Sequence, residues 1–196
     1  MIRPLAAVLF LALVPYVAAQ DDKKPNLYPL TEGNKWQYVV TVMGNKVDVV
    51  TEVTASKTSK GKTKATVTAK GPDGKDIAEE LTADDKGVYR SSISGVKTDR
   101  PLTIIKYPVK NGATWTEKLQ INGMDAEVTT EVGETEEVKV AAGKYKATPH
   151  EATIKIAGQE VKAISWYADG VGIVKQKMSF GGIDATMELK KFTKGE

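Results

Sequence analysis

The sequence has 196 residues, of which 41% are hydrophobic, 27% charged and 7% aromatic, a composition typical of folded globular proteins and not of disordered chains. It contains no cysteine and one histidine, which excludes disulfides, thiolate metal sites and cysteine nucleophiles. The formal net charge of +3 is too small to indicate a polyanion partner, so no nucleic-acid binding is predicted.

Residues 1–19 have the parts of a secretory signal peptide. A basic start at Arg3 is followed by an apolar run over residues 5–14 and by the small residues Ala18 and Ala19. The alternative is a membrane anchor, but Pro15 ends the run, and a spanning helix needs roughly 20 apolar residues. We therefore expect cleavage after residue 19, export to the periplasm or the cell exterior, and no membrane span in the mature chain. Lipid attachment at a cysteine is excluded.

The mature chain is predicted to be all β. Residues 20–26 are polar, include Pro25 and are predicted to be disordered. From Trp36 onward, β-branched and aromatic residues alternate with polar ones between turn residues, which is the pattern of antiparallel strands. Residues 77–85 are the best helical candidate by composition, but their neighbours favour a strand.

Two further patterns lie between residues 44 and 64. A row of alternating residues after the turn at Gly44 predicts a second strand, made by Val47, Val49, Thr51 and Val53. A basic cluster, Lys57, Lys60, Lys62 and Lys64, contains no aromatic residue and lies among Ser, Thr and Gly. We interpret this cluster as a solvated hairpin end.

The chain resembles itself at an offset of 79 residues. Residues 33–53 correspond to residues 112–132, with Trp36 matching Trp115. Shorter matches continue the correspondence, from residues 61–66 to 143–148 and from 83–88 to 168–173. Residues 27–196 are therefore predicted to form one β domain of two repeats, about 33–110 and 112–194.

The predicted architecture is a duplicated antiparallel meander that forms one curved or barrel-like sheet of about 10–12 strands. The alternative is a pair of packed β lobes. The connection over residues 106–112 is too short for a flexible linker between lobes, and this favours one sheet.

Three segments together resemble a family of bacterial secreted β-rich proteins of unknown function. They are residues 28–38 (YPLTEGNKWQY), 142–145 (AGKY) and 166–175 (WYADGVGIVK). The family shares a Pro-Leu-x-x-Gly-Asn-x-Trp start and a Trp-Tyr-Ala-Pro-Gly-Val-Gly end, and Asp169 replaces its usual proline with another turn former. The resemblance implies an exported β-rich domain with no established activity. More distantly, the chain is similar to lipoprotein carriers whose curved sheets shield acyl chains.

No motif indicates catalysis or a cofactor. His150-Glu151 begins a zinc-like His-Glu-x-x-His pattern, but Ile154 stands where the second histidine is needed, and His150 is in phase with a core-facing row. Residues 61–63 and 170–172 lack the glycines and helices of nucleotide-binding loops. Adjacent carboxylates such as Glu79-Glu80 point to opposite faces of a strand. We predict no catalytic residue, no metal site and no cofactor.

Aromatic side chains are the candidates for ligand binding. They could line an apolar pocket or anchor the core, and they are Trp36, Trp115, Trp166 and Tyr167. The first hypothesis for function is an exported, non-catalytic β-protein that binds a lipid-like or other apolar small molecule, or an envelope component. The second is an envelope or extracellular scaffold that contacts proteins through strand edges. The third is a hydrolase that uses carboxylates from different strands.

Overall fold

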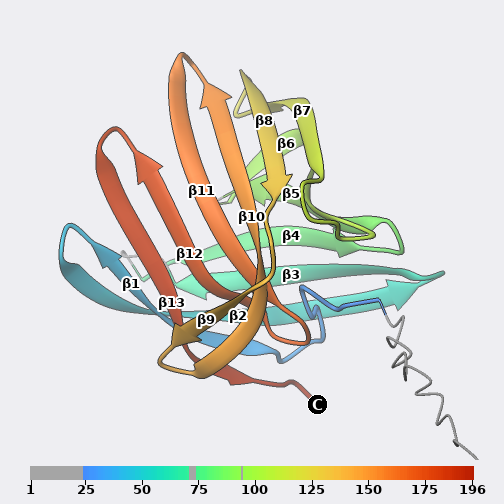
Figure 1. The fold of residues 1–196 in the computed structure, drawn as a ribbon. Helices are drawn as coiled ribbons and strands as arrows, with labels where there is room; N and C mark the ends of the chain where they lie inside the picture. The colour runs from blue at the N-terminus through green and yellow to red at the C-terminus, as the bar shows by residue number, and fades with distance from the viewer. Residues whose placement is uncertain (1–23, 71–73, 94) are drawn as a thin grey trace, which may run out of the picture.

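The protein's structure is a computed structural model that describes residues 24–70, 74–93 and 95–196 (Figure 1). The expected signal peptide, residues 1–19, lies outside these residues. Within them the chain folds into strands joined by turns, without a helix. The strands are β1 (Lys35–Val42), β2 (Asn45–Ser59), β3 (Lys62–Lys70), β4 (Asp76–Ala83), β5 (Gly87–Ile93), β6 (Val96–Lys106), β7 (Thr114–Ile121), β8 (Met124–Val132), β9 (Glu136–Val140), β10 (Gly143–Ile156), β11 (Gln159–Ala168), β12 (Gly172–Phe180) and β13 (Ile183–Thr193).

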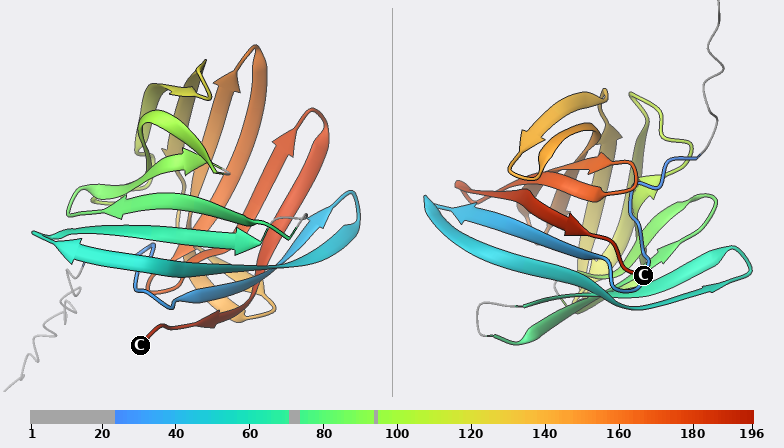
Figure 2. Two further views of the ribbon diagram at one scale, coloured as in Figure 1. Left: turned by 180° about the vertical axis from the view of Figure 1, so that it is seen from behind. Right: turned by 90° about the horizontal axis from the view of Figure 1, so that it is seen from below.

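All the strands belong to one antiparallel sheet. Its order is β11-β12-β13-β1-β2-β3-β4-β5-β6-β7-β8-β10-β9, and a further pairing of β11 with β10 closes it into a barrel. β9 is an additional strand that pairs with the other part of β10. In the left view of Figure 2, β2, β3 and β4 run across the direction of β10 to β13. The expectation of an all-β, barrel-like antiparallel sheet is confirmed.

The turns that precede β1 and β7 have matching hydrogen bonds. The Gly33 amide donates to the Val53 carbonyl at 2.9 Å, and 79 positions later the Gly112 amide donates to the Val132 carbonyl at 2.8 Å. Two more backbone hydrogen bonds recur at this offset. The long β2 corresponds to β8 plus β9, which residues 133–135 separate, and this break gives one strand more than expected. Such geometry is what an internal duplication would produce.

The barrel has one seam where backbone pairing is sparse. β6 and β7 share the single residue pair Thr98 and Ile121, whereas the other neighbouring strands pair over longer stretches. Side chains join the strands instead. The Glu117 carboxylate accepts from the Thr103 amide at 2.8 Å and from its hydroxyl at 3.0 Å, and Trp115 Nε1 donates to the Thr103 carbonyl at 3.2 Å.

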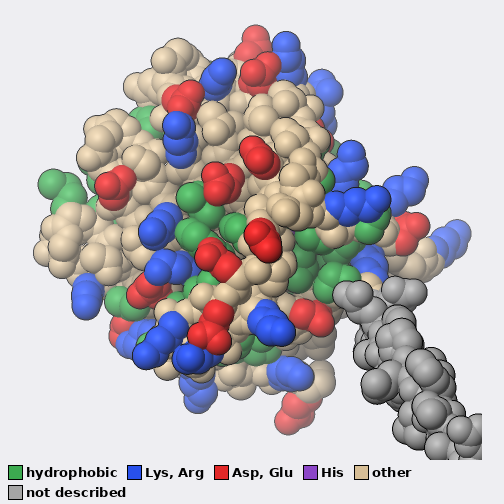
Figure 3. Space-filling model, viewed as in Figure 1, with side chains coloured by type: hydrophobic (Ala, Val, Ile, Leu, Met, Phe, Trp, Pro, Cys, Tyr) green, Lys and Arg blue, Asp and Glu red, His purple; other side chains and the backbone are tan. Residues whose placement is uncertain are grey.

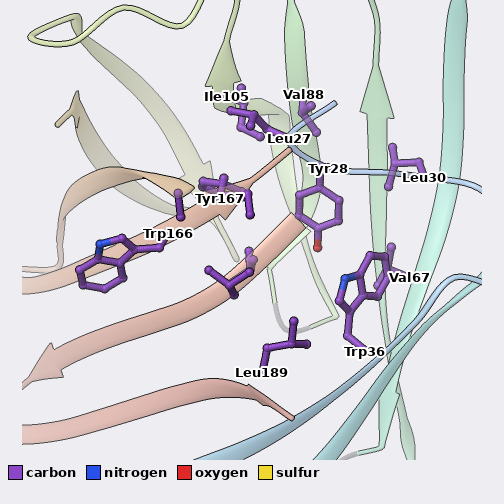
Figure 4. Close-up of a cluster of buried hydrophobic side chains, with 14 of the residues drawn as sticks. Leu27, Tyr28, Leu30, Trp36, Val67, Val88, Ile105, Trp166, Tyr167 and Leu189 are labelled. Atoms are coloured by element: carbon purple, nitrogen blue, oxygen red, sulfur yellow. The ribbon is translucent and has the colours of Figure 1, made fainter. Parts of the chain in front are cut away.

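The N-terminal segment closes one end of the barrel. Leu27, Tyr28 and Leu30 are buried in the main hydrophobic cluster, where Tyr28 lies between strands from both halves of the chain (Figure 4). Asn26 donates its amide to Asp169 Oδ1 at 2.7 Å, and Lys24 Nζ lies 4.0 Å from the centre of the Tyr107 ring. Lys24 and Asn26 therefore make defined contacts, while residues 20–23 of the predicted disordered segment lie outside the described residues.

The opposite end carries two-residue hairpin turns. The turn residues have positive φ angles, for example 49° and 82° at Met43 and Gly44, and 52° and 74° at Asn122 and Gly123. This conformation suits the twist of a hairpin and favours Gly and Asn. Exposed apolar side chains gather near the turns at this end: Val42, Met43, Val47, Val96, Met124, Met178, Phe180 and Ile183.

The row predicted over residues 47–53 is buried only at its inner end. Val53 is fully buried, while Val47 is 61% exposed because it lies at the hairpin tip, where the opposite wall of the barrel no longer covers it. Lys57, Lys60, Lys62 and Lys64 are exposed around the β2–β3 turn, as expected for a solvated hairpin end. On the face drawn in Figure 3, basic and acidic side chains are interspersed.

Candidate ligand site inside the barrel

Two adjoining cavities lie inside the barrel. The larger has a volume of about 320 Å³. It reaches from Tyr28 and Trp36, at the end closed by the N-terminal segment, to Ile77 and Met178, near the hairpin turns of the opposite end, which we call the open end. The smaller has a volume of about 130 Å³. Their walls share Arg90, Gln176 and Met178, so the cavities meet at these side chains. Both are lined mainly by apolar residues, including Val67, Ala69, Ile173 and Met187 in the larger and Leu102, Ile104, Val128 and Ile154 in the smaller.

A charged pair lies where the cavities meet. Arg90 Nε lies 3.2 Å from Glu79 Oε2, close enough for an ion pair but not aligned as a hydrogen bond. The two side chains are 22% and 24% exposed. Burial alone would lower the pKa of Arg90, but Glu79 and the Tyr28 hydroxyl keep this pKa above its ordinary value. Arg90 is thus a cation whose charge Glu79 balances.

Neutral polar groups surround this pair. Burial raises the pKa of the Tyr28 and Tyr167 phenols above the ordinary value of 10.0, which keeps both hydroxyls protonated. Gln176 Nε2 donates to Ser165 Oγ at 2.7 Å, and both side chains line the smaller cavity. The centre of the barrel is therefore polar but without excess charge, and apolar walls extend from it.

His150 lines the smaller cavity and is only 3% exposed. Burial lowers its pKa from 6.5 to about 4, although the nearby Thr148 backbone slightly favours the charged form, so the imidazole is neutral near pH 7. Among the described residues, neither ring nitrogen has a hydrogen-bond partner with acceptable geometry. The inward orientation expected from its phase with Ala152 and Ile154 is the one observed.

The aromatic rings form a continuous chain through the interior. The centroid distances are 5.4 Å from Phe192 to Trp36, 6.1 Å from Trp36 to Tyr28, 6.3 Å from Tyr28 to Tyr167 and 5.0 Å from Tyr167 to His150. Figure 4 shows Tyr28 between Trp36 and Tyr167. Aromatic contacts in this range stabilise a fold beyond simple burial.

The structure separates the four aromatic residues that the sequence suggested for binding. Trp36 lines the larger cavity and Tyr167 the smaller. Trp115 ends the aromatic chain, 6.3 Å from His150, but lines neither cavity. Trp166 points away from the cavities towards β9, and its Nε1 donates to Glu136 Oε1 at 2.5 Å. Neighbours on a strand face opposite sides, which is why Trp166 and Tyr167 differ.

Sequence reasoning missed Arg90 and Gln176, and it considered Glu79 only as one of two adjacent carboxylates. A signal for the two charged residues was present, since Glu79 lies in phase with Ile77 and Leu81, and Arg90 lies two positions after Val88. A charge at a position that alternation assigns to the interior marks a buried pair or a binding group. The partner of each charge could not be read from the sequence, because it depends on the pairing of β4 with β5.

Other sites have less support. Glu79 is the single carboxylate among the described residues that line the two interior cavities. No three His, Asp or Glu side chains within the described part of the chain lie together as metal ligands. A wider hollow of about 750 Å³ lies at the open end, where charged side chains of both signs, such as Asp99, Arg100 and Lys118, line it. Across residues 24–70, 74–93 and 95–196, no helix has the length and apolar character needed to cross a membrane.

The fold is similar to that of solved bacterial proteins. A candidate lipoprotein from Parabacteroides distasonis superposes with a TM-score of 0.59 at 14% identity, over 86% of this chain and 99% of that one. A candidate exported protein with a YmcC-like fold from Bacteroides fragilis gives 0.58 at 16% identity, over 85% and 98%. No protein-family model and no curated protein matches the sequence. At these identities the likeness concerns the fold.

Proposed function

We propose that the protein is an exported, non-catalytic binding protein that holds a lipid-like or other apolar small molecule inside the barrel. The observation that carries the proposal is the pair of adjoining, mainly apolar cavities of about 320 and 130 Å³. Ligand sites for small molecules typically have volumes of about 300–1,000 Å³, apolar walls and a few convergent polar groups. The polar centre at Arg90 and Gln176 provides such groups.

The shape of the barrel also supports this function. The closed end is filled by the N-terminal segment, whereas the larger cavity extends towards Met178 and Ile77, near the hairpin turns. Exposed apolar side chains such as Met43 and Phe180 lie at these turns. An apolar ligand that approaches this end meets apolar surface before it reaches the cavity. Export is supported by the signal-peptide pattern of residues 1–19.

The alternatives have weaker support. A scaffold that binds through strand edges needs free edges, and closure by the β10–β11 pairing removes most of them. A two-carboxylate hydrolase needs a second acid in the cavity beside Glu79, which is already paired with Arg90.

Native mass spectrometry of mature protein from a secreting host, followed by denaturing lipid analysis, tests the proposal. We expect a bound small molecule that is released on unfolding and is replaced by added apolar probes. If the protein carries no small molecule and binds neither apolar dyes nor lipids, the proposal is wrong. A stoichiometric protein partner would then favour the scaffold.

A further inference from the structure

We propose that the barrel selects an uncharged amphiphile, whose hydroxyl-bearing head group bonds to His150 and whose acyl chain fills the larger cavity. This inference rests on the proposed function and adds the chemical class of the ligand. Monoacylglycerols are the simplest members of that class.

The first argument is the unsatisfied imidazole. His150 is 3% exposed and lines the smaller cavity. Apart from the Thr148 backbone, whose geometry is poor, neither ring nitrogen has a hydrogen-bond partner among the described residues. Buried polar atoms are rarely left unpaired, because each unpaired atom loses the hydrogen bonds that it makes with water in the unfolded chain. A neutral imidazole offers one donor and one acceptor, and a hydroxyl group offers the same two functions. The two groups are therefore complementary.

The second argument is the charge balance beside the imidazole. Arg90 already faces Glu79 at 3.2 Å, so the polar centre has no spare positive charge. A carboxylate or phosphate head would add a second anion beside Glu79, in a place where water is largely excluded. Burying an unbalanced charge is costly, whereas a neutral hydroxyl can use His150, Ser165 and Gln176 without that penalty.

The third argument is the arrangement of the cavities. The larger one has walls of Val67, Ile173 and Met187, suited to an acyl chain, and it meets the smaller at Arg90 and Gln176. A chain in the larger cavity therefore places its head group at the polar centre.

The experiment compares 1-monopalmitoylglycerol with palmitate, which share one acyl chain and differ in head-group charge. Calorimetric titration of delipidated protein at pH 7.5 should give an affinity about tenfold higher for the monoacylglycerol, which is the effect of one hydrogen bond lost or one charge left unbalanced. In His150→Phe, which keeps a ring but no polar atom, the affinity for the monoacylglycerol should fall about tenfold and that for palmitate should change little. His150→Leu replaces this variant if it fails to fold.

Glu79→Gln provides a test by gain of binding. This substitution leaves Arg90 without its counter-charge, so palmitate affinity should rise about tenfold and the preference for the monoacylglycerol should disappear. Trp166→Phe, outside the cavities, should leave both affinities unchanged. Equal or tighter binding of palmitate by the unmodified protein would overturn the inference, and so would an unchanged monoacylglycerol affinity in the His150 variant that folds. If neither compound nor any apolar probe binds, the proposed function itself fails.

Discussion

Arg90 and Glu79 face one another inside the barrel at 3.2 Å, from neighbouring strands β5 and β4. They form the charged centre of an otherwise apolar interior. The two residues are close in the sequence, and the β4–β5 turn brings their strands side by side. Tyr28, in the N-terminal segment, places its hydroxyl near Arg90. The pair thus links the sheet to the segment that closes its end.

Breaking this pair should destabilise the fold more than removing both charges. We expect Glu79→Gln and Arg90→Met each to lower the free energy of unfolding by about 1–3 kcal/mol, less than for fully buried pairs because both side chains keep some exposure. The double variant should lose clearly less than the sum of the two, because no charge then stays unbalanced. Urea unfolding followed by circular dichroism gives the four values. Strict additivity would show that the charges are not coupled.

The single histidine predicts a pH dependence of stability. The folded protein resists protonation of His150 down to a pKa of about 4, while the unfolded chain takes up the proton near pH 6.5. Below pH 6.5 the proton binds to the unfolded chain but not to the folded protein, so the free energy of unfolding falls. The loss begins near pH 6.5 and reaches roughly 3 kcal/mol as the pH approaches 4.

Urea unfolding at pH 7.5 and 4.5 measures this effect by comparison of the protein with its His150→Phe variant. The variant should lose less stability on acidification, since the carboxylates are common to both proteins. NMR titration of the one imidazole in the sequence gives its pKa directly. A value near 6.5 would contradict the buried position.

The alternation of apolar and polar residues and the turn residues were enough to predict the strands and the barrel-like sheet. Successive side chains of a strand point to opposite faces, so a strand with one buried face has an apolar residue at every second position. These patterns also gave the inward orientation of His150. They could not tell Trp166 from Tyr167, since both are apolar aromatics and the sheet is covered on its outer side there by β9. Arg90 and Glu79 show the other limit. Their phase was readable, but the cavity that they share is formed by strands from both halves of the chain.

Close backbone packing predicts that Gly87 tolerates no side chain. A Cβ atom at this position would lie 2.3 Å from the Ile105 carbonyl oxygen, which belongs to the paired strand β6. Gly87→Ala must therefore push β5 and β6 apart, at an expected cost of about 1–3 kcal/mol. Thermal unfolding checks this value. The matched control is Lys86→Ala in the exposed turn next to it, which should change stability by less than about 0.5 kcal/mol. Similar stability of the two variants would contradict the packing.

Two tryptophans distinguish a ligand inside the barrel from one on its surface. Trp36 lines the larger cavity and is 2% exposed, while Trp166 packs outside the cavities against β9. An acyl chain that carries bromine atoms quenches indole fluorescence on contact, so a ligand in the cavity should quench Trp36 far more than Trp166. We expect Trp36→Phe to remove most of the quenching and Trp166→Phe to preserve it. Both variants must first show cooperative unfolding, since Trp36 also donates to the Val171 carbonyl at 2.6 Å. Quenching that disappears with Trp166 instead would move the ligand to the outer face of β11, and the interior cavities would then have no role in binding.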